Sequence, residues 1–249
     1  LACICARRLG KGRSEHTVIL GMLMTSGLIQ LFCGYVETYA FLFPVFLLYL
    51  LLGLLSLQGQ SPLWGVAVLL GFLIPFHFAL VTLVPSMALL VWMQTESRSM
   101  GGRLVQGIVY CGLSLGVAAV VLVLIDFDFA FYIASSKSTH LLPFWGGSDF
   151  VYPYGLFSVG HGIDVLNLYL LVAPGALMGV FLVGRWGWLG DLNDRFLFAA
   201  TLFPVVFTLI AHPGIGGFRD WDAFSYPALP LSLWAGLRLI RYARGTQVG

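Results

Sequence analysis

A short charged segment, GFRDWDAFSYP at residues 217–227, lies between two long apolar stretches. It places Arg219, Asp220 and Asp222 around one tryptophan, in a chain of which only 10% of the residues are charged. A guanidinium binds phosphate or pyrophosphate through paired hydrogen bonds, and the glycines within residues 214–217 let the backbone approach a ligand closely. The segment therefore indicates a phosphate-binding site. The alternative is a loop in which the two aspartates neutralise the arginine.

A second polar group follows helical spacing. His161, Asp164 and Asn167 recur at every third residue, so they share one face at the start of a predicted helix. His161 and Asp164 are candidate binding residues, although Asp164 could equally be a first-turn acid stabilised by the helix dipole. With Glu37 they could in principle bind a divalent metal, but the spacing matches no zinc signature. We assign no metal ligand and no other cofactor.

Two isolated polar residues complete the set of candidate binding side chains. Glu37 is the only charged residue between His16 and Glu96. A carboxylate at the end of a membrane span must be solvated or paired, so it is either wetted by lipid headgroups or part of a site. His77 follows Pro75 at a predicted turn, where the alternative is an interfacial histidine with satisfied hydrogen bonds.

Membrane-spanning helices must position these residues. The chain of 249 residues is 59% hydrophobic and has a mean hydropathy of +0.92. A soluble domain would have about a quarter of its residues charged, so the composition predicts an all-α, polytopic transmembrane bundle. The net charge of +2 gives no indication of nucleic-acid binding, because the basic residues lie at the ends of apolar segments.

The apolar segments predict a single transmembrane domain over residues 1–249, with both termini in the cytoplasm of a bacterial inner (plasma) membrane. We interpret residues 63–93 as two short spans that meet near His77, because this leaves only Lys137 and Arg219 on the outer side, as the positive-inside rule favours. The expected spans are 17–34, 39–57, 63–75, 77–93, 104–125, 165–183, 196–212 and 226–240, with an external loop at 126–164.

The stretch LFCGYVETYA at 31–40, followed by a Leu-rich helix, resembles the GT-C superfamily of membrane glycosyltransferases, in the group of protein O-mannosyltransferases and aminoarabinose transferases. Residues 71–85, which contain PFHFAL, look like a short helix pair of that family, and 217–230 resembles its late external loop. The resemblance runs from about Leu1 to Arg244. The main catalytic acid of the family lies in its first external loop, so the resemblance implies an N-terminally incomplete chain with no catalytic residue to assign in it.

The resemblance implies inverting transfer of a sugar from a polyprenyl-phosphate carrier to an acceptor at the non-cytoplasmic face. Arg219 would stabilise the leaving phosphate, and other polar residues would orient hydroxyl groups. Membrane lipids and the lipid-linked sugar are the expected partners. The alternatives are a non-catalytic multi-pass protein and a lipid or solute transporter, although no charge is predicted at mid-membrane. The expected substrate-binding residues are Glu37, His77, His161, Asp164, Arg219, Asp220 and Asp222.

Overall fold

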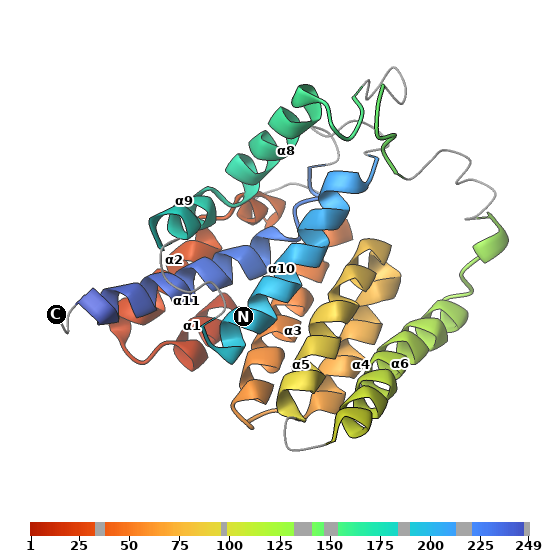
Figure 1. Cartoon of the computed structure of the whole chain (residues 1–249), viewed down its shortest axis with the longest axis horizontal. Helices are drawn as coiled ribbons and strands as arrows, with labels where there is room; N and C mark the ends of the chain where they lie inside the picture. The colour runs from red at the N-terminus through yellow and green to blue at the C-terminus, as the bar shows by residue number, and fades with distance from the viewer. Residues whose placement is uncertain are drawn as a thin grey trace.

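The computed structural model describes residues 1–32, 38–95, 99–131, 141–146, 154–183, 190–212 and 221–246 (Figure 1). The regular elements in these residues are helices, which confirms the predicted all-α class. The α-helices are α1 (Ala2–Leu9), α2 (Arg13–Met24), α3 (Leu42–Leu57), α4 (Leu63–Leu73), α5 (Val84–Gln94), α6 (Met100–Leu124), α8 (Val159–Val172), α9 (Pro174–Val183), α10 (Leu192–Ile210) and α11 (Ala228–Thr246). The 3₁₀ helices are η1 (Gly27–Phe32), η2 (Thr38–Phe41), η3 (Ile74–Phe76) and η4 (Phe78–Leu83).

The helices form two groups joined by α10. In one group α3, α4, α5 and α6 run alternately in opposite directions (Figure 1), and α6 packs against both α4 and α5. In the other group α11 packs against α2 and α9, and α1 packs against α2. Helix α10 lies between the groups and contacts α3, α5 and η4 as well as α11. The turn that joins α3 to α4, the end of α5 and the start of α6 lie at one end of the first group, and the junction of α4 with α5 lies at the other (Figure 1).

A fully buried tyrosine ties three helices of this core together. Tyr49 on α3 has its hydroxyl 2.8 Å from Ser86 Oγ on α5. Its ring centroid lies 6.0 Å from that of Phe196 on α10. Ser86 donates its own proton to the Leu83 carbonyl at 2.7 Å, so the Tyr49 hydroxyl donates to Ser86. An apolar interior thus accommodates a tyrosine because its one polar group is hydrogen-bonded.

Proline residues set two breaks in the helical segments. Pro75 lies in η3, after which His77 adopts an extended backbone (φ −156°, ψ 102°) before η4 begins. Pro174 begins α9 after a break at Ala173, because a proline cannot donate the hydrogen bond that would continue α8 and its ring clashes with the preceding turn. The stretch 165–183, expected as one span, therefore belongs to two shorter helices.

The expected span 17–34 is also interrupted. Helix α2 ends at Met24, and the chain then packs closely against the end of α8. Ser26 donates its hydroxyl proton to the Val172 carbonyl at 2.6 Å. A Cβ at Gly27 would lie 2.3 Å from the Leu171 carbonyl oxygen, so only glycine fits there. The pattern of apolar residues could not predict this contact between segments that are distant in the sequence.

Two helices in the described part of the chain, α6 and α10, are long and apolar enough to cross a membrane. The shorter apolar helices are Leu42–Leu57, Leu63–Phe76, Phe78–Gln94 and Val159–Val172. One face of α6 carries large apolar side chains that stay exposed among the described residues, among them Ile108, Val123 and Leu124, which are 72%, 74% and 78% exposed. Such a continuous apolar face is typical of a surface that meets lipid. The arrangement as eight spans stays a prediction.

A candidate ligand site at one end of the bundle

The predicted binding residues divide into two groups. Glu37, Arg219 and Asp220 lie outside the described residues. His77, His161, Asp164 and Asp222 are described, and the structure brings His77 together with Asp222 but places His161 and Asp164 elsewhere.

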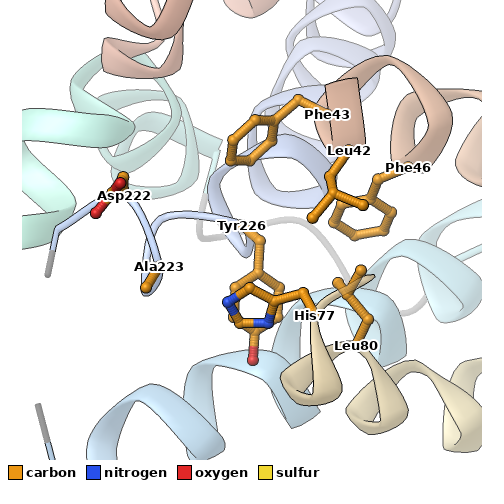
Figure 2. Close-up of a pocket in the computed structure, with 8 residues that line it drawn as sticks. All are labelled: Leu42, Phe43, Phe46, His77, Leu80, Asp222, Ala223 and Tyr226. Carbon is orange, nitrogen blue, oxygen red and sulfur yellow. The ribbon is translucent and has the colours of Figure 1, made fainter. Parts of the chain in front are cut away.

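His77 and Asp222 line one small cavity (Figure 2). His77 comes from the junction of η3 and η4, and Asp222 from the turn that precedes α11. The His77 ring packs against the ring of Tyr226, with 5.6 Å between centroids and 48° between planes. Apolar side chains of α3 close one side of the cavity. The other lining residues are Leu42, Phe43, Phe46, Leu80 and Ala223.

Hydrogen bonds to backbone carbonyls hold the two segments that carry His77 and Asp222. Ser225 donates its backbone N–H and its hydroxyl to the Asp222 carbonyl, at 3.2 Å and 2.6 Å. The Tyr226 hydroxyl donates to the Ala79 carbonyl of η4 at 3.5 Å. On the opposite wall the His77 carbonyl accepts from Leu80 N at 2.8 Å. The turn before α11 is thereby held against the junction of α4 and α5.

The cavity can bind hydroxyl groups but leaves little room. A neutral imidazole offers one donor and one acceptor, which suits the orientation of a hydroxyl group. The space among the described residues has a volume of about 10 Å³, which is room for about one water molecule.

A larger cavity, lined by apolar side chains, lies next to this small one. Its volume is about 240 Å³, and Phe43 lines both cavities. An apolar cavity of about 150 Å³ stays dry and binds hydrophobic molecules, so this one favours an apolar occupant. Its lining residues come from α1, α2, η1, α3 and α11. They are Leu1, Ala2, Leu23, Met24, Leu28, Ile29, Phe43, Pro44, Leu47 and Leu229.

His161 is a structural contact between two helices. Ser158 caps α8 by accepting from His161 N at 3.1 Å, and His161 Nε2 donates to the Leu209 carbonyl on α10 at 2.8 Å. The side chain is buried and does not line the cavity of His77. The alternative that Asp164 is a first-turn acid is wrong, because the Ser158 cap starts α8 at Val159, inside the expected loop 126–164, and places Asp164 in the second turn.

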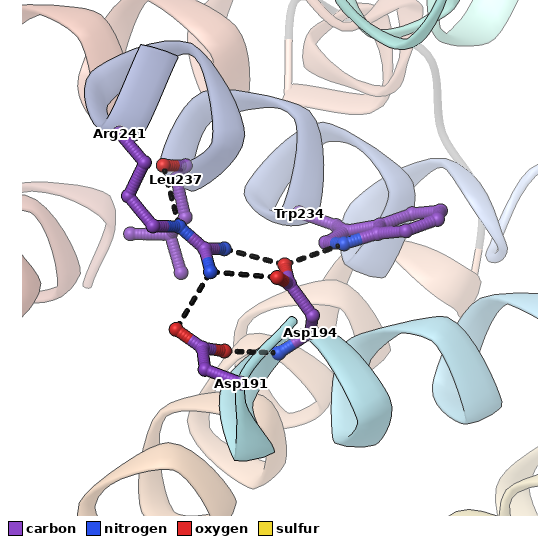
Figure 3. Close-up of polar contacts among 5 residues, drawn as sticks. All are labelled: Asp191, Asp194, Trp234, Leu237 and Arg241. Carbon is purple, nitrogen blue, oxygen red and sulfur yellow. Dashed lines mark hydrogen bonds and ion pairs between the residues drawn. The ribbon is translucent and has the colours of Figure 1, made fainter. Parts of the chain in front are cut away.

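Sequence reasoning missed a charged cluster between α10 and α11 (Figure 3). Arg241 pairs with both Asp191 and Asp194, and Trp234 Nε1 donates to Asp194 at 2.9 Å. Asp191 also caps α10, accepting from Asp194 N at 2.8 Å. The sequence signal was present: Asp191 and Asp194 have the spacing of a capping box ahead of an apolar helix.

The described residues give no support for a metal centre. Within them, no three His, Cys, Asp or Glu side chains gather in a way that could hold an ion. The hypothesis that used Glu37 includes a residue outside the described ranges.

Comparison with known proteins adds no further assignment. No family model, curated protein or solved structure matches this chain. Its function must therefore be argued from the two cavities and from the chemistry of the residues around them.

Proposed function

We propose that the chain is a membrane glycosyltransferase of the GT-C type, which takes a sugar from a polyprenyl-phosphate carrier and transfers it to an acceptor at the non-cytoplasmic face. The observation that carries this proposal is the pair of neighbouring cavities that share Phe43. His77 and Asp222 lie in the lining of one, and the other is lined by apolar side chains, so together they could receive a ligand with a polar head and a hydrocarbon chain.

In this proposal the apolar cavity receives part of the prenyl chain. A prenyl chain has no hydrogen-bonding groups, and every residue lining the cavity is apolar. Transfer of hydrocarbon surface from water into such a cavity is favourable by about 25 cal/mol per Å². The chain would reach the cavity from the bilayer, where its remaining isoprene units stay.

The polar head would lie toward the turn that precedes α11. His77 and Asp222 would hydrogen-bond sugar or acceptor hydroxyls, since a neutral imidazole donates and accepts and a carboxylate accepts. Arg219 precedes Asp222 by three residues in the sequence. Its guanidinium would bind the phosphate and stabilise the charge that develops as the sugar leaves. The catalytic acid is not assigned to a residue of this sequence.

The sidedness of the proposal rests on the sequence and the helix order. The junction of α4 with α5, which carries His77, lies at the end of the bundle opposite the α3–α4 turn and the start of α6 (Figure 1). Arg103 lies in the first turn of α6, at that opposite end. Because basic residues favour the cytoplasmic side, the cavities would open toward the non-cytoplasmic face.

Binding of a polyprenyl phosphate to the purified full chain, measured by native mass spectrometry, tests the proposal. Ala2→Phe adds bulk to the apolar cavity, whereas Cys3→Phe adds the same bulk at an exposed position of the same helix. We expect Ala2→Phe and Arg219→Gln to reduce retention of the lipid and Cys3→Phe to leave it unchanged. Equal retention by all four proteins would overturn the proposal. Retention that depends on Ala2 but is followed by no sugar transfer would favour a lipid-handling protein without chemistry.

A further inference from the structure

We propose that the hairpin formed by α1 and α2 binds the headgroups of anionic phospholipids, independently of any sugar transfer. Four basic residues, Arg7, Arg8, Lys11 and Arg13, lie at and beside the turn of this hairpin, and all four are exposed. Within the described ranges, none of their side chains forms an ion pair. The turn therefore presents a concentrated positive charge to an external partner.

The acid nearest to this turn in the sequence is already engaged. Glu15 is the sole carboxylate in the first 36 residues. Its carboxylate accepts from the Lys11 backbone N–H at 2.6 Å and from Arg244 Nε at 2.8 Å. These hydrogen bonds hold the pKa of Glu15 below its usual value, so the group stays ionised and holds α2 to the end of α11. Its charge is shared with Arg244, and the basic turn remains positive.

The helix dipole accounts for only two of the four basic residues at this turn. Arg7 and Arg8 lie in the last turn of α1, where the helix dipole favours a positive charge. Arg13, in contrast, is the first residue of α2, where the same dipole disfavours a cation, and Lys11 belongs to neither helix. Four like charges within seven residues also repel one another. A bound anion offsets both the unfavourable interaction of Arg13 with the helix dipole and the repulsion among the four cations. The fold alone offsets neither.

The neighbouring side chains indicate that the anion belongs to a lipid surface. Ile4 and Arg8, like Cys3 and Arg7, are four residues apart and so share a face of α1. Ile4 is 53% exposed, and Cys3 is exposed as well. One helical turn of about 5.4 Å separates each such pair. An apolar group one turn away from a cation matches the step from acyl chains to headgroups at a membrane interface.

The test compares phosphatidylglycerol with phosphatidylcholine, titrated into the delipidated full chain and followed by native mass spectrometry. We expect the wild-type protein to bind phosphatidylglycerol more tightly. The double variant Arg7→Gln/Arg8→Gln should bind it about 30-fold more weakly, because each surface cation contributes about fivefold to the affinity for an anionic lipid. The matched variant Arg103→Gln/Arg195→Gln removes the same charge from other helices and should retain the wild-type preference.

Two results would overturn the proposal. One is equal affinity of the wild-type protein for the two lipids, and the other is an equal loss in both double variants. The wild-type protein alone gives a second test that does not depend on the folding of a variant. Raising the ammonium acetate concentration from 0.1 M to 1 M shortens the Debye length from about 10 Å to about 3 Å. This should weaken binding of phosphatidylglycerol but not of phosphatidylcholine, and a phosphatidylglycerol affinity that salt leaves unchanged would contradict the proposal.

Discussion

Arg241 on α11 donates hydrogen bonds to both carboxylate oxygens of Asp194 in the first turn of α10 (Figure 3). The bond from Nη1 to Oδ2 is 2.6 Å long. Asp194 is 2% exposed, whereas the Arg241 side chain is 33% exposed and also reaches Asp191. The pair therefore holds α10 and α11 together through one buried carboxylate and one partly solvated guanidinium.

Asp194→Asn should lower the free energy of unfolding by roughly 3 kcal/mol, because it removes one partner of a buried ion pair. Asp191→Asn is the matched control. Its side chain is 44% exposed, exposed ion pairs contribute about 1 kcal/mol or less, and asparagine remains a good N-cap. Urea unfolding of both variants in one detergent, followed by circular dichroism, measures the difference. Equal destabilisation by the two substitutions would contradict the structural role given to Asp194.

Gly71→Ala should destabilise the contact between α4 and α6 by about 1–3 kcal/mol, as overpacking does. A Cβ at residue 71 would lie 2.3 Å from the Ser114 carbonyl oxygen and 2.7 Å from Val117 Cβ. Gly112→Ala on α6 provides the control, because nothing lies within 4 Å of the added atom. Alanine is the better helix former, so this variant should be as stable as wild type or slightly more so. Thermal unfolding curves that rank Gly112→Ala below Gly71→Ala would refute the predicted packing.

The exposed face of α6 should contact lipid. Leu115→Arg would place a charge near the middle of this helix, which disfavours insertion by about 2.5–3.5 kcal/mol. Met100→Arg places the same residue at the helix end, where the long side chain can reach the interface. Leu115 and Met100 are both exposed. We expect only Leu115→Arg to reduce the carbonate-resistant membrane fraction. A similar fraction for both variants would mean that α6 does not lie across the bilayer.

The sequence allowed some features to be predicted because they depend on composition and local spacing. The apolar content indicated a helical protein, and Pro75 marked the position where α4 gives way to η3 and His77. Other features depend on contacts between distant residues. Ser26, just after the end of α2, donates a hydrogen bond to the Val172 carbonyl, which no local pattern reveals.

The candidate site shows the same division. The chemical character of His77 and Asp222 was evident from the sequence, but their common cavity arises because the turn before α11 packs on η4. His161 was also a candidate binding residue, yet its ring hydrogen-bonds to the Leu209 carbonyl. Residue type alone cannot distinguish these two histidines, since each lies close to the start of a helix.

The most direct measurement of the central claim is photocrosslinking at Phe43, which lines both cavities. p-Benzoylphenylalanine replaces Phe43 in one protein and Phe72, which is 41% exposed on α4, in another. Each is irradiated in proteoliposomes that contain a radiolabelled polyprenyl phosphate. We predict labelling at position 43 that excess unlabelled polyprenyl phosphate competes away, and only weak, uncompeted labelling at position 72. Equal labelling at both positions, or no competition at position 43, would contradict the assignment of these cavities to a lipid-linked substrate.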